Sequence, residues 1–262
     1  MTARPSLEAL LARDRIIVLA GLAGVTALAW AYLVGLAANM SAVPNTLGEV
    51  LAATEMSAWG LRDFTLMLLM WAVMMVGMMV PSAAPMILVF AAFNRKQSES
   101  GRPFVSTGVF LLGYLVVWTL FSLGATLLQY ALERGALLSP MMTTTSPLLG
   151  GALLVAAGVY QWTPLKYACL RHCRTPPQFI LYHWRPGAGG ALRMGLEHGA
   201  YCLGCCWILM GLLFVGGVMN LLWIALIAGF VLLEKALRLG EVAGRATGVA
   251  LAVCGLVVLV WA

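Results

Sequence analysis

Charged residues are scarce in this sequence: they make up 10% of its 262 residues, whereas 62% are hydrophobic. Soluble domains are typically about half apolar and a quarter charged. The two longest polar stretches, about 39–63 and 164–195, are too short to form a separate soluble domain. The sequence also has no low-complexity tract, no repeat of fixed period and no phosphate-binding loop that would indicate nucleotide-driven pumping. These absences argue against an ordinary soluble protein and against an ATP-driven pump.

Long apolar runs account for the missing charge. A helix that crosses a bilayer needs about 20 mostly apolar residues, and the sequence offers candidates at about 16–38, 64–93, 104–132, 147–163, 196–219, 220–237 and 246–262. The first run follows several arginines, as a signal peptide would, but it exceeds the ~7–15 apolar residues of a signal sequence. We therefore expect it to remain as an anchor. The sequence predicts an all-α fold: residues 1–262 form one polytopic transmembrane domain with about seven spans.

The net charge of +6 is unevenly distributed along the chain. Between the predicted spans, alternate segments hold fourteen of the sixteen Lys and Arg residues, and the opposite segments hold only Arg62 and Arg134. The fourteen are Arg4, Arg13, Arg15, Arg95, Lys96, Arg102, Lys166, Arg171, Arg174, Arg185, Arg193, Lys235, Arg238 and Arg245. Basic residues favour the cytoplasmic side of a membrane. This pattern predicts a cytoplasmic N-terminus and an external C-terminus, and it makes a nucleic-acid partner unnecessary.

Soft metal ligands are concentrated in one short part of the chain. Five of the six cysteines and all three histidines lie between residues 169 and 206. In "HGAYCLGCCW", residues 198–207, helical spacing places one histidine and three cysteines on a single face, and "CLRHC", residues 169–173, does the same for two cysteines and a histidine. The predicted metal ligands are Cys169, His172, Cys173, His198, Cys202, Cys205 and Cys206.

Their predicted location restricts the chemistry. Thiols on the cytoplasmic side stay reduced, so a structural disulfide framework is not expected. Thiolate and imidazole ligands suit Cu(I), which is favoured here, or zinc. One helix cannot close a tetrahedral site alone, so we predict that the two clusters meet around one metal. Dithiol redox chemistry and plain packing are the alternatives, and packing is the expected role of the isolated Cys254.

Methionines are dense in the second apolar run, "FTLMLLMWAVMMVGMMVPSAAPMILVF". Thioethers are soft ligands that also fill gaps in cores, so these residues are either a path for Cu(I) or packing and lipid-facing side chains. Two more methionines extend the cysteine-bearing face of residues 194–210. The candidate relay residues are Met67, Met70, Met74, Met75, Met78, Met79, Met194 and Met210. Pro81 and Pro85 follow in the same run, and we expect them to kink or open the helix, as at transporter binding sites or as a simple kink.

Three charged residues adjoin these segments. Glu234 and Lys235 end the sixth run, where ionisable groups are functional candidates, although snorkelling or a salt bridge at the rim is the favoured interpretation. Glu197 precedes His198, and it is either a partner of that imidazole or an interfacial charge.

Four of these motifs, in order, resemble a known family: "MWAVMMVGMMVPSAAPM", "YQWTPLKYACLRHC", "MGLEHGAYCLGCCW" and "GVMNLLWIALIAGFVLLEKAL". They are similar to a bacterial family of predicted metal-binding integral membrane proteins, a domain of unknown function, over about residues 63–237. The resemblance implies a multi-pass protein of the bacterial inner membrane. It implies metal binding through the cysteines and histidines named above, together with a methionine and proline pattern. The family label names neither the metal nor a reaction.

The sequence thus favours a membrane protein that binds, relays or inserts copper or zinc, with the lipid bilayer around it and a metal chaperone or metalloenzyme as partner. Two alternatives stay open. One is an enzyme, either a membrane thiol–disulfide oxidoreductase or a metal-dependent one, although a non-enzymatic role is favoured. The other is a small-molecule transporter or scaffold subunit. The oligomeric state is not determined by the sequence.

Overall fold

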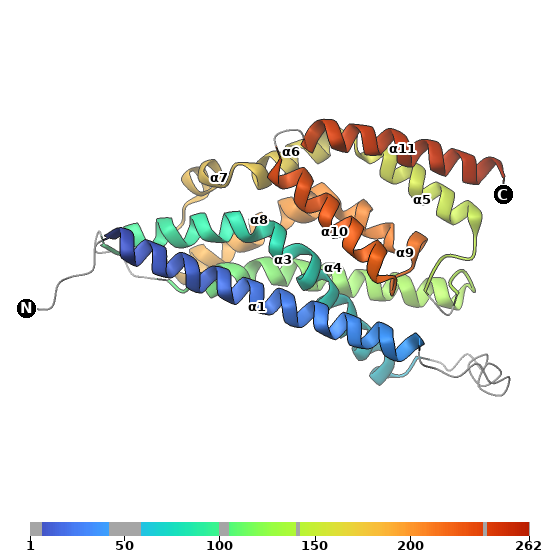
Figure 1. Cartoon of the computed structure of the whole chain (residues 1–262), viewed down its shortest axis with the longest axis horizontal. Helices are drawn as coiled ribbons and strands as arrows, with labels where there is room; N and C mark the ends of the chain where they lie inside the picture. The colour runs from blue at the N-terminus through green and yellow to red at the C-terminus, as the bar shows by residue number, and fades with distance from the viewer. Residues whose placement is uncertain (1–6, 42–58, 100–104, 140–141, 238–239, 262) are drawn as a thin grey trace, which may run out of the picture.

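A computed structural model describes residues 7–41, 59–99, 105–139, 142–237 and 240–261, and this part of the chain is largely helical (Figure 1). The helices are α1 (Leu7–Ser41), α3 (Leu61–Glu99), α4 (Thr107–Arg134), α5 (Pro147–Tyr160), α6 (Pro164–Arg174), α7 (Pro176–His183), α8 (Gly187–Gly211), α9 (Leu213–Gly216), α10 (Leu221–Ala236) and α11 (Gly240–Val260). The prediction of an all-α fold is confirmed for these residues. Arg4, Arg102 and Arg238, which entered the charge count, lie outside them.

Five helical segments of the described chain are long and apolar enough to cross a membrane. Four of them lie in α1, α3, α4 and α11, and the fifth combines α8 and α9. The helices α5 and α6 would form a sixth span if they are counted together as one span bent by 64°. These segments are compatible with membrane insertion. The sixth predicted span, 220–237, corresponds to α10, whose 16 residues extend only about 24 Å at 1.5 Å per residue. The predicted polar stretch 164–195 is itself mostly helical, since it contains α6, α7 and the beginning of α8.

The bend between α5 and α6 has a local cause. Thr163 ends the turn with its side chain accepting a hydrogen bond from the Lys166 amide, and Pro164 opens α6. Proline is suited to the first position of a helix, where no amide donor is needed, but it cannot continue the preceding one. The sequence Thr-Pro therefore stops α5 and starts α6 in a new direction.

Glycines allow two helix pairs to approach closely. A Cβ atom on Gly195 of α8 would lie 2.0 Å from the Phe110 carbonyl oxygen of α4, and one on Gly113 of α4 would lie 2.3 Å from the Leu192 oxygen. On the other side of the bundle, α5 and α11 (yellow-green and dark red in Figure 1) pack together in the same way. A Cβ atom on Gly158 of α5 would lie 2.6 Å from the backbone of α11. Small residues at helix interfaces are typical of membrane bundles.

The prolines of α3 do not break the helix, contrary to one of the two expected outcomes. The helical backbone runs from Leu61 to Glu99 with Pro81 and Pro85 inside it, and Figure 1 shows the helix changing direction along its length. Pro81 has no amide hydrogen to donate to the carbonyl four residues earlier, that of Gly77. The indole of Trp30 on α1 donates to that carbonyl instead, at 3.3 Å. The kink thus remains hydrogen-bonded within the bundle.

Candidate functional site

Cysteines from α6 and α8 meet inside the bundle. Cys202, Cys205 and Cys206 on α8 are at most 1% exposed, and Cys173 on α6 is 9% exposed. The Cys173 side chain lies close to those of Cys202 and Cys205, and the Cys206 side chain lies close to the same two. We call these four residues the sulfur cluster. The structure therefore brings together the two segments that the sequence analysis paired.

Within the sulfur cluster the thiols point toward their own helix. The Sγ atoms of Cys205 and Cys206 each lie 3.1 Å from the carbonyl oxygen of Cys202, to which they donate. In this arrangement no group of three or more His, Cys, Asp or Glu side chains in the described ranges is set to hold a metal ion. Coordination by the cluster would require the thiols to lose their protons and rotate away from that carbonyl.

Cys202 is the point where four helices are joined by polar contacts. The ammonium of Lys235 on α10 donates to the Cys202 sulfur at 3.0 Å and to the Ser82 hydroxyl of α3 at 2.9 Å. The Tyr114 hydroxyl of α4 lies 3.1 Å from the same sulfur and 3.1 Å from the Met79 carbonyl oxygen of α3. Its single proton can be given to either acceptor. The proline-containing part of α3 thus faces the α8 cysteine.

A second buried charged group lies next to this junction. Lys166 of α6 and Glu234 of α10 form an ion pair of 2.6 Å with side chains 0% and 1% exposed, and Lys166 also donates to Gln161. This corrects the sequence analysis, which favoured Glu234 and Lys235 at the rim and counted both lysines as loop charges. Helix packing covers both positions: Glu234 pairs with Lys166, whereas Lys235 donates to the Ser82 hydroxyl and the Cys202 sulfur.

The candidate relay methionines are almost all in the core. Met67 is half-buried, and the other seven are at most 3% exposed. The buried set is Met70, Met74, Met75, Met78, Met79, Met194 and Met210. The sulfur of Met194 accepts the amide of Arg185 at 3.4 Å. The alternative of lipid-facing methionines therefore does not apply to the buried seven, whereas packing and a role as ligands both remain compatible with their positions.

The histidines occupy two different environments. His198 is 2% exposed, and its Nδ1 atom has no hydrogen-bond partner. His172 and His183 are half-buried at the ends of α6 and α7. His172 stacks on Tyr201 of α8 with ring centres 4.0 Å apart.

Three further residues from the sequence analysis are separate from the cluster or at its margin. Cys169 is half-buried and packs against Gly204 of α8, because a Cβ atom on that glycine would lie 2.7 Å from the Cys169 sulfur. Glu197 pairs with Arg193 at 3.1 Å and Arg185 at 3.4 Å, which fits the interfacial interpretation. Cys254 is exposed on α11.

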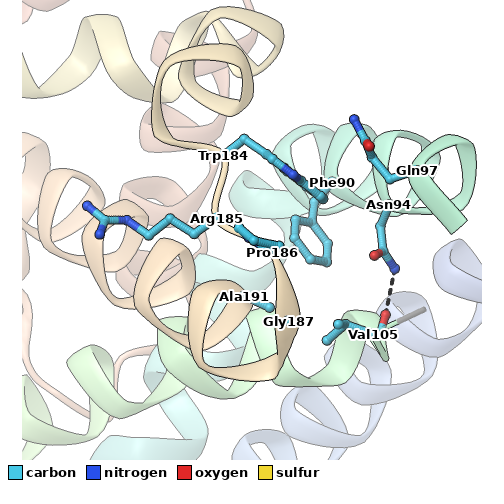
Figure 2. A pocket seen from close by; sticks show the side chains of 9 residues that line it. All are labelled: Phe90, Asn94, Gln97, Val105, Trp184, Arg185, Pro186, Gly187 and Ala191. Carbon is cyan, nitrogen blue, oxygen red and sulfur yellow. Dashed lines mark hydrogen bonds between the residues drawn. The ribbon is translucent and has the colours of Figure 1, made fainter. Parts of the chain in front are cut away.

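A pocket lies between the end of α3 and the beginning of α8, away from these cysteines (Figure 2). Its wall includes Phe90, Trp184 and Ala191, and the Asn94 amide donates across to the Val105 carbonyl at 2.6 Å. No residue of the sulfur cluster lines it.

Of the polar residues that surround Cys202, the sequence analysis missed Tyr114 and Ser82 and placed Lys235 at the rim. Tyr114 and Ser82 lie within apolar runs, where a single hydroxyl carries little signal. Lys235 and Lys166 had a stronger signal, because lysines beside apolar runs are costly unless paired. What the sequence could not supply was the partner atoms, since Lys235 is 33 residues from Cys202 and 153 from Ser82.

Comparison with known proteins gives one match. A family model described as PpoB2, copper chaperone, matches residues 68–258. The matched range includes most of α3, all of α4 to α10 and most of α11, and therefore every residue of the sulfur cluster and its polar surroundings. No curated protein and no solved structure matches the chain.

Proposed function

Since the chain belongs to the PpoB2 copper chaperone family, we propose that it is an integral membrane protein that holds Cu(I) at the sulfur cluster and delivers it to a metalloenzyme. The observation that carries this proposal is the meeting of four buried cysteines from two helices. Thiolates are soft ligands and prefer soft ions such as Cu(I). Copper is the cargo in this proposal, held until a recipient takes it.

Lys235 prepares Cys202 for the metal. Two lysines, Lys166 and Lys235, are buried nearby with one glutamate, Glu234, which leaves one positive charge without a carboxylate. Buried charges are stable only when they are paired. A thiolate at Cys202, 3.0 Å from the Lys235 ammonium, supplies the balancing charge. Cu(I) would bind the Cys202 thiolate, and the thiols of Cys205 and Cys206 would turn from the backbone to complete the site, each releasing its proton to solvent as its bond to copper forms.

The membrane arrangement in this proposal combines the helices with the charge pattern. The short helix α10 and the bent pair α5–α6 act as spans beside the five long ones, which gives seven crossings in one domain over residues 1–262. The excess of Lys and Arg on alternate segments sets the N-terminus in the cytoplasm and the C-terminus outside. The family resemblance described above supports a location in the bacterial inner membrane.

Metal content of the purified protein tests the proposal. We expect Cu(I) bound in stoichiometric amount, with sulfur neighbours in X-ray absorption spectra. Cys202→Ser combined with Cys205→Ser should lose the metal, while Cys254→Ser serves as the matched control because that cysteine is exposed on α11, away from the cluster. Copper retention by the double variant equal to that of the control would overturn the proposal.

The same thiols would also suit a dithiol oxidoreductase, since Cys173 contacts Cys202 and Cys205 across the helix interface. Mass tagging of free thiols in intact cells separates the two functions. Thiols that stay reduced through growth support copper handling, whereas a Cys173-linked disulfide that forms and disappears supports redox catalysis.

A further inference from the structure

Two histidines form a pair outside the sulfur cluster. The rings of His172 and His183 have centres 6.2 Å apart and planes at 75°. Each ring stacks on an aromatic neighbour: His172 on Tyr201 at 4.0 Å, and His183 on Phe179 at 4.6 Å. These contacts fix the orientation of both imidazoles where α6 and α7 end.

Hydrogen bonds determine which nitrogen of each ring is free. The Nδ1 atom of His172 lies 2.8 Å from the Ala168 carbonyl oxygen, and that of His183 lies 3.1 Å from the Phe179 carbonyl oxygen. A carbonyl can only accept, so both Nδ1 atoms carry the proton and both Nε2 atoms keep a lone pair. Histidines that bind metals usually donate their other ring N–H to a carbonyl or carboxylate in this way.

The separation of the rings fits two imidazoles that share one ion. With metal–nitrogen bonds of about 2.0–2.1 Å, the ring centre lies about 3.2 Å from the metal. Two rings on opposite sides of an ion therefore have centres about 6.4 Å apart, close to the 6.2 Å observed. Cu(I) commonly accepts such two-coordinate geometry, and imidazole is among its ligands.

A line of rings leads from this pair toward the sulfur cluster. The edge of Phe179 packs against His198 with ring centres 5.6 Å apart. His198, with its unpartnered Nδ1, stacks on Tyr114 at 5.6 Å, and the Tyr114 hydroxyl lies 3.1 Å from the Cys202 sulfur.

We propose that His172 and His183 form a loading site that takes Cu(I) from outside the bundle, with His198 between it and the sulfur cluster. This inference rests on the proposed function, because it supplies the route to the same cysteines.

The test is the rate at which the full-length, detergent-purified protein takes Cu(I) from a coloured Cu(I)–chelator complex. The variant is His172→Asn with His183→Asn: asparagine keeps a donor near the Nδ1 position and removes Nε2. Tyr182→Ala is the matched control, since Tyr182 neighbours His183 on α7 and is 85% exposed. We expect the asparagine variant to load at least about tenfold more slowly, because a tenfold rate change needs only about 1.4 kcal/mol of lost stabilisation. Its final copper content should be unchanged, and the control should load at the wild-type rate.

Loading of the asparagine variant at the wild-type rate would overturn the inference while leaving the sulfur site intact. Wild-type protein that holds copper on nitrogen alone, with loss in the asparagine variant, would support the histidine site and overturn the sulfur cluster. If the asparagine variant melts below the control, His172→Gln with His183→Gln replaces it in the same assay. Loading of the glutamine variant at the wild-type rate contradicts the histidine site.

Discussion

The ion pair between Lys166 and Glu234 gives a quantitative test of the buried charge network. Glu234→Gln keeps the shape of the side chain but removes its charge, which leaves the buried Lys166 ammonium with only neutral partners. Breaking a buried pair from one side costs about 3–5 kcal/mol. In a chain of this size each kcal/mol lowers the melting temperature by about 2–4 °C. We therefore expect a decrease of roughly 6–20 °C.

A pair in a different environment provides the control. Glu241 contacts Arg174 at 3.3 Å, but its side chain is 53% exposed. Exposed pairs contribute about 0–1 kcal/mol, so Glu241→Gln should lower the melting temperature by no more than about 4 °C. Intrinsic tryptophan fluorescence during heating measures both variants. Equal melting temperatures for the two would refute the reasoning.

Removing both charges distinguishes an uncompensated charge from a loss of packing. Replacing a buried pair with apolar residues of similar size is often neutral or stabilising. Lys166→Met combined with Glu234→Met should therefore recover at least half of the stability that Glu234→Gln loses. A double variant less stable than Glu234→Gln would show that the packing of these side chains, and not their charge balance, sets the cost.

Three further outcomes are expected. Lys235→Met removes the charged donor from the Cys202 sulfur. Because hydrogen bonds to charged groups contribute about 1.5–3 kcal/mol, Cu(I) affinity measured by chelator competition should fall about 10–100-fold. An unchanged affinity would argue against the pairing of Lys235 with Cys202. Gly113→Ala places a Cβ 2.3 Å from a backbone oxygen of α8, whereas Gly124→Ala in the same helix meets nothing within 4 Å. In thermal unfolding we expect Gly113→Ala to lower the free energy of unfolding by about 1–3 kcal/mol, and Gly124→Ala to leave it unchanged. Trp30→Phe leaves the carbonyl freed by the α3 proline without its indole donor and should cost about 1–3 kcal/mol, visible as a lower melting temperature.

The sequence was most informative where local spacing decides the structure. The cysteines of α8 share a face because residues three and four apart do so on any helix, and all three are buried. Thr163 and Pro164 illustrate the limit: the sequence analysis saw here only the change from an apolar run to a polar stretch, although this cap and proline start a helix.

Pairings between distant elements could not be predicted in the same way. Cys173 and His172 are adjacent, and spacing placed both on the ligand face of one helix. The structure directs the cysteine to the sulfur cluster and the histidine to Tyr201, because the position of α7 and α8 around α6 decides what each side meets. The burial of Lys235 could not be predicted for the same reason, because it depends on acceptors for the ammonium group that α3 and α8 supply.

If the four cysteines hold copper as proposed, the closed packing around them would affect how fast the ion can leave. A recipient's ligand cannot reach a sulfur atom that has almost no exposed surface unless a helix first moves aside. Such movements occur over microseconds to milliseconds or longer, and their frequency, rather than the strength of the metal–sulfur bonds, would then limit turnover. The same burial limits the access of dissolved oxidants to the thiols. Under the proposed function, retention and release would thus depend on separate properties of the protein, and the rate of release could change without a change in the strength of metal binding.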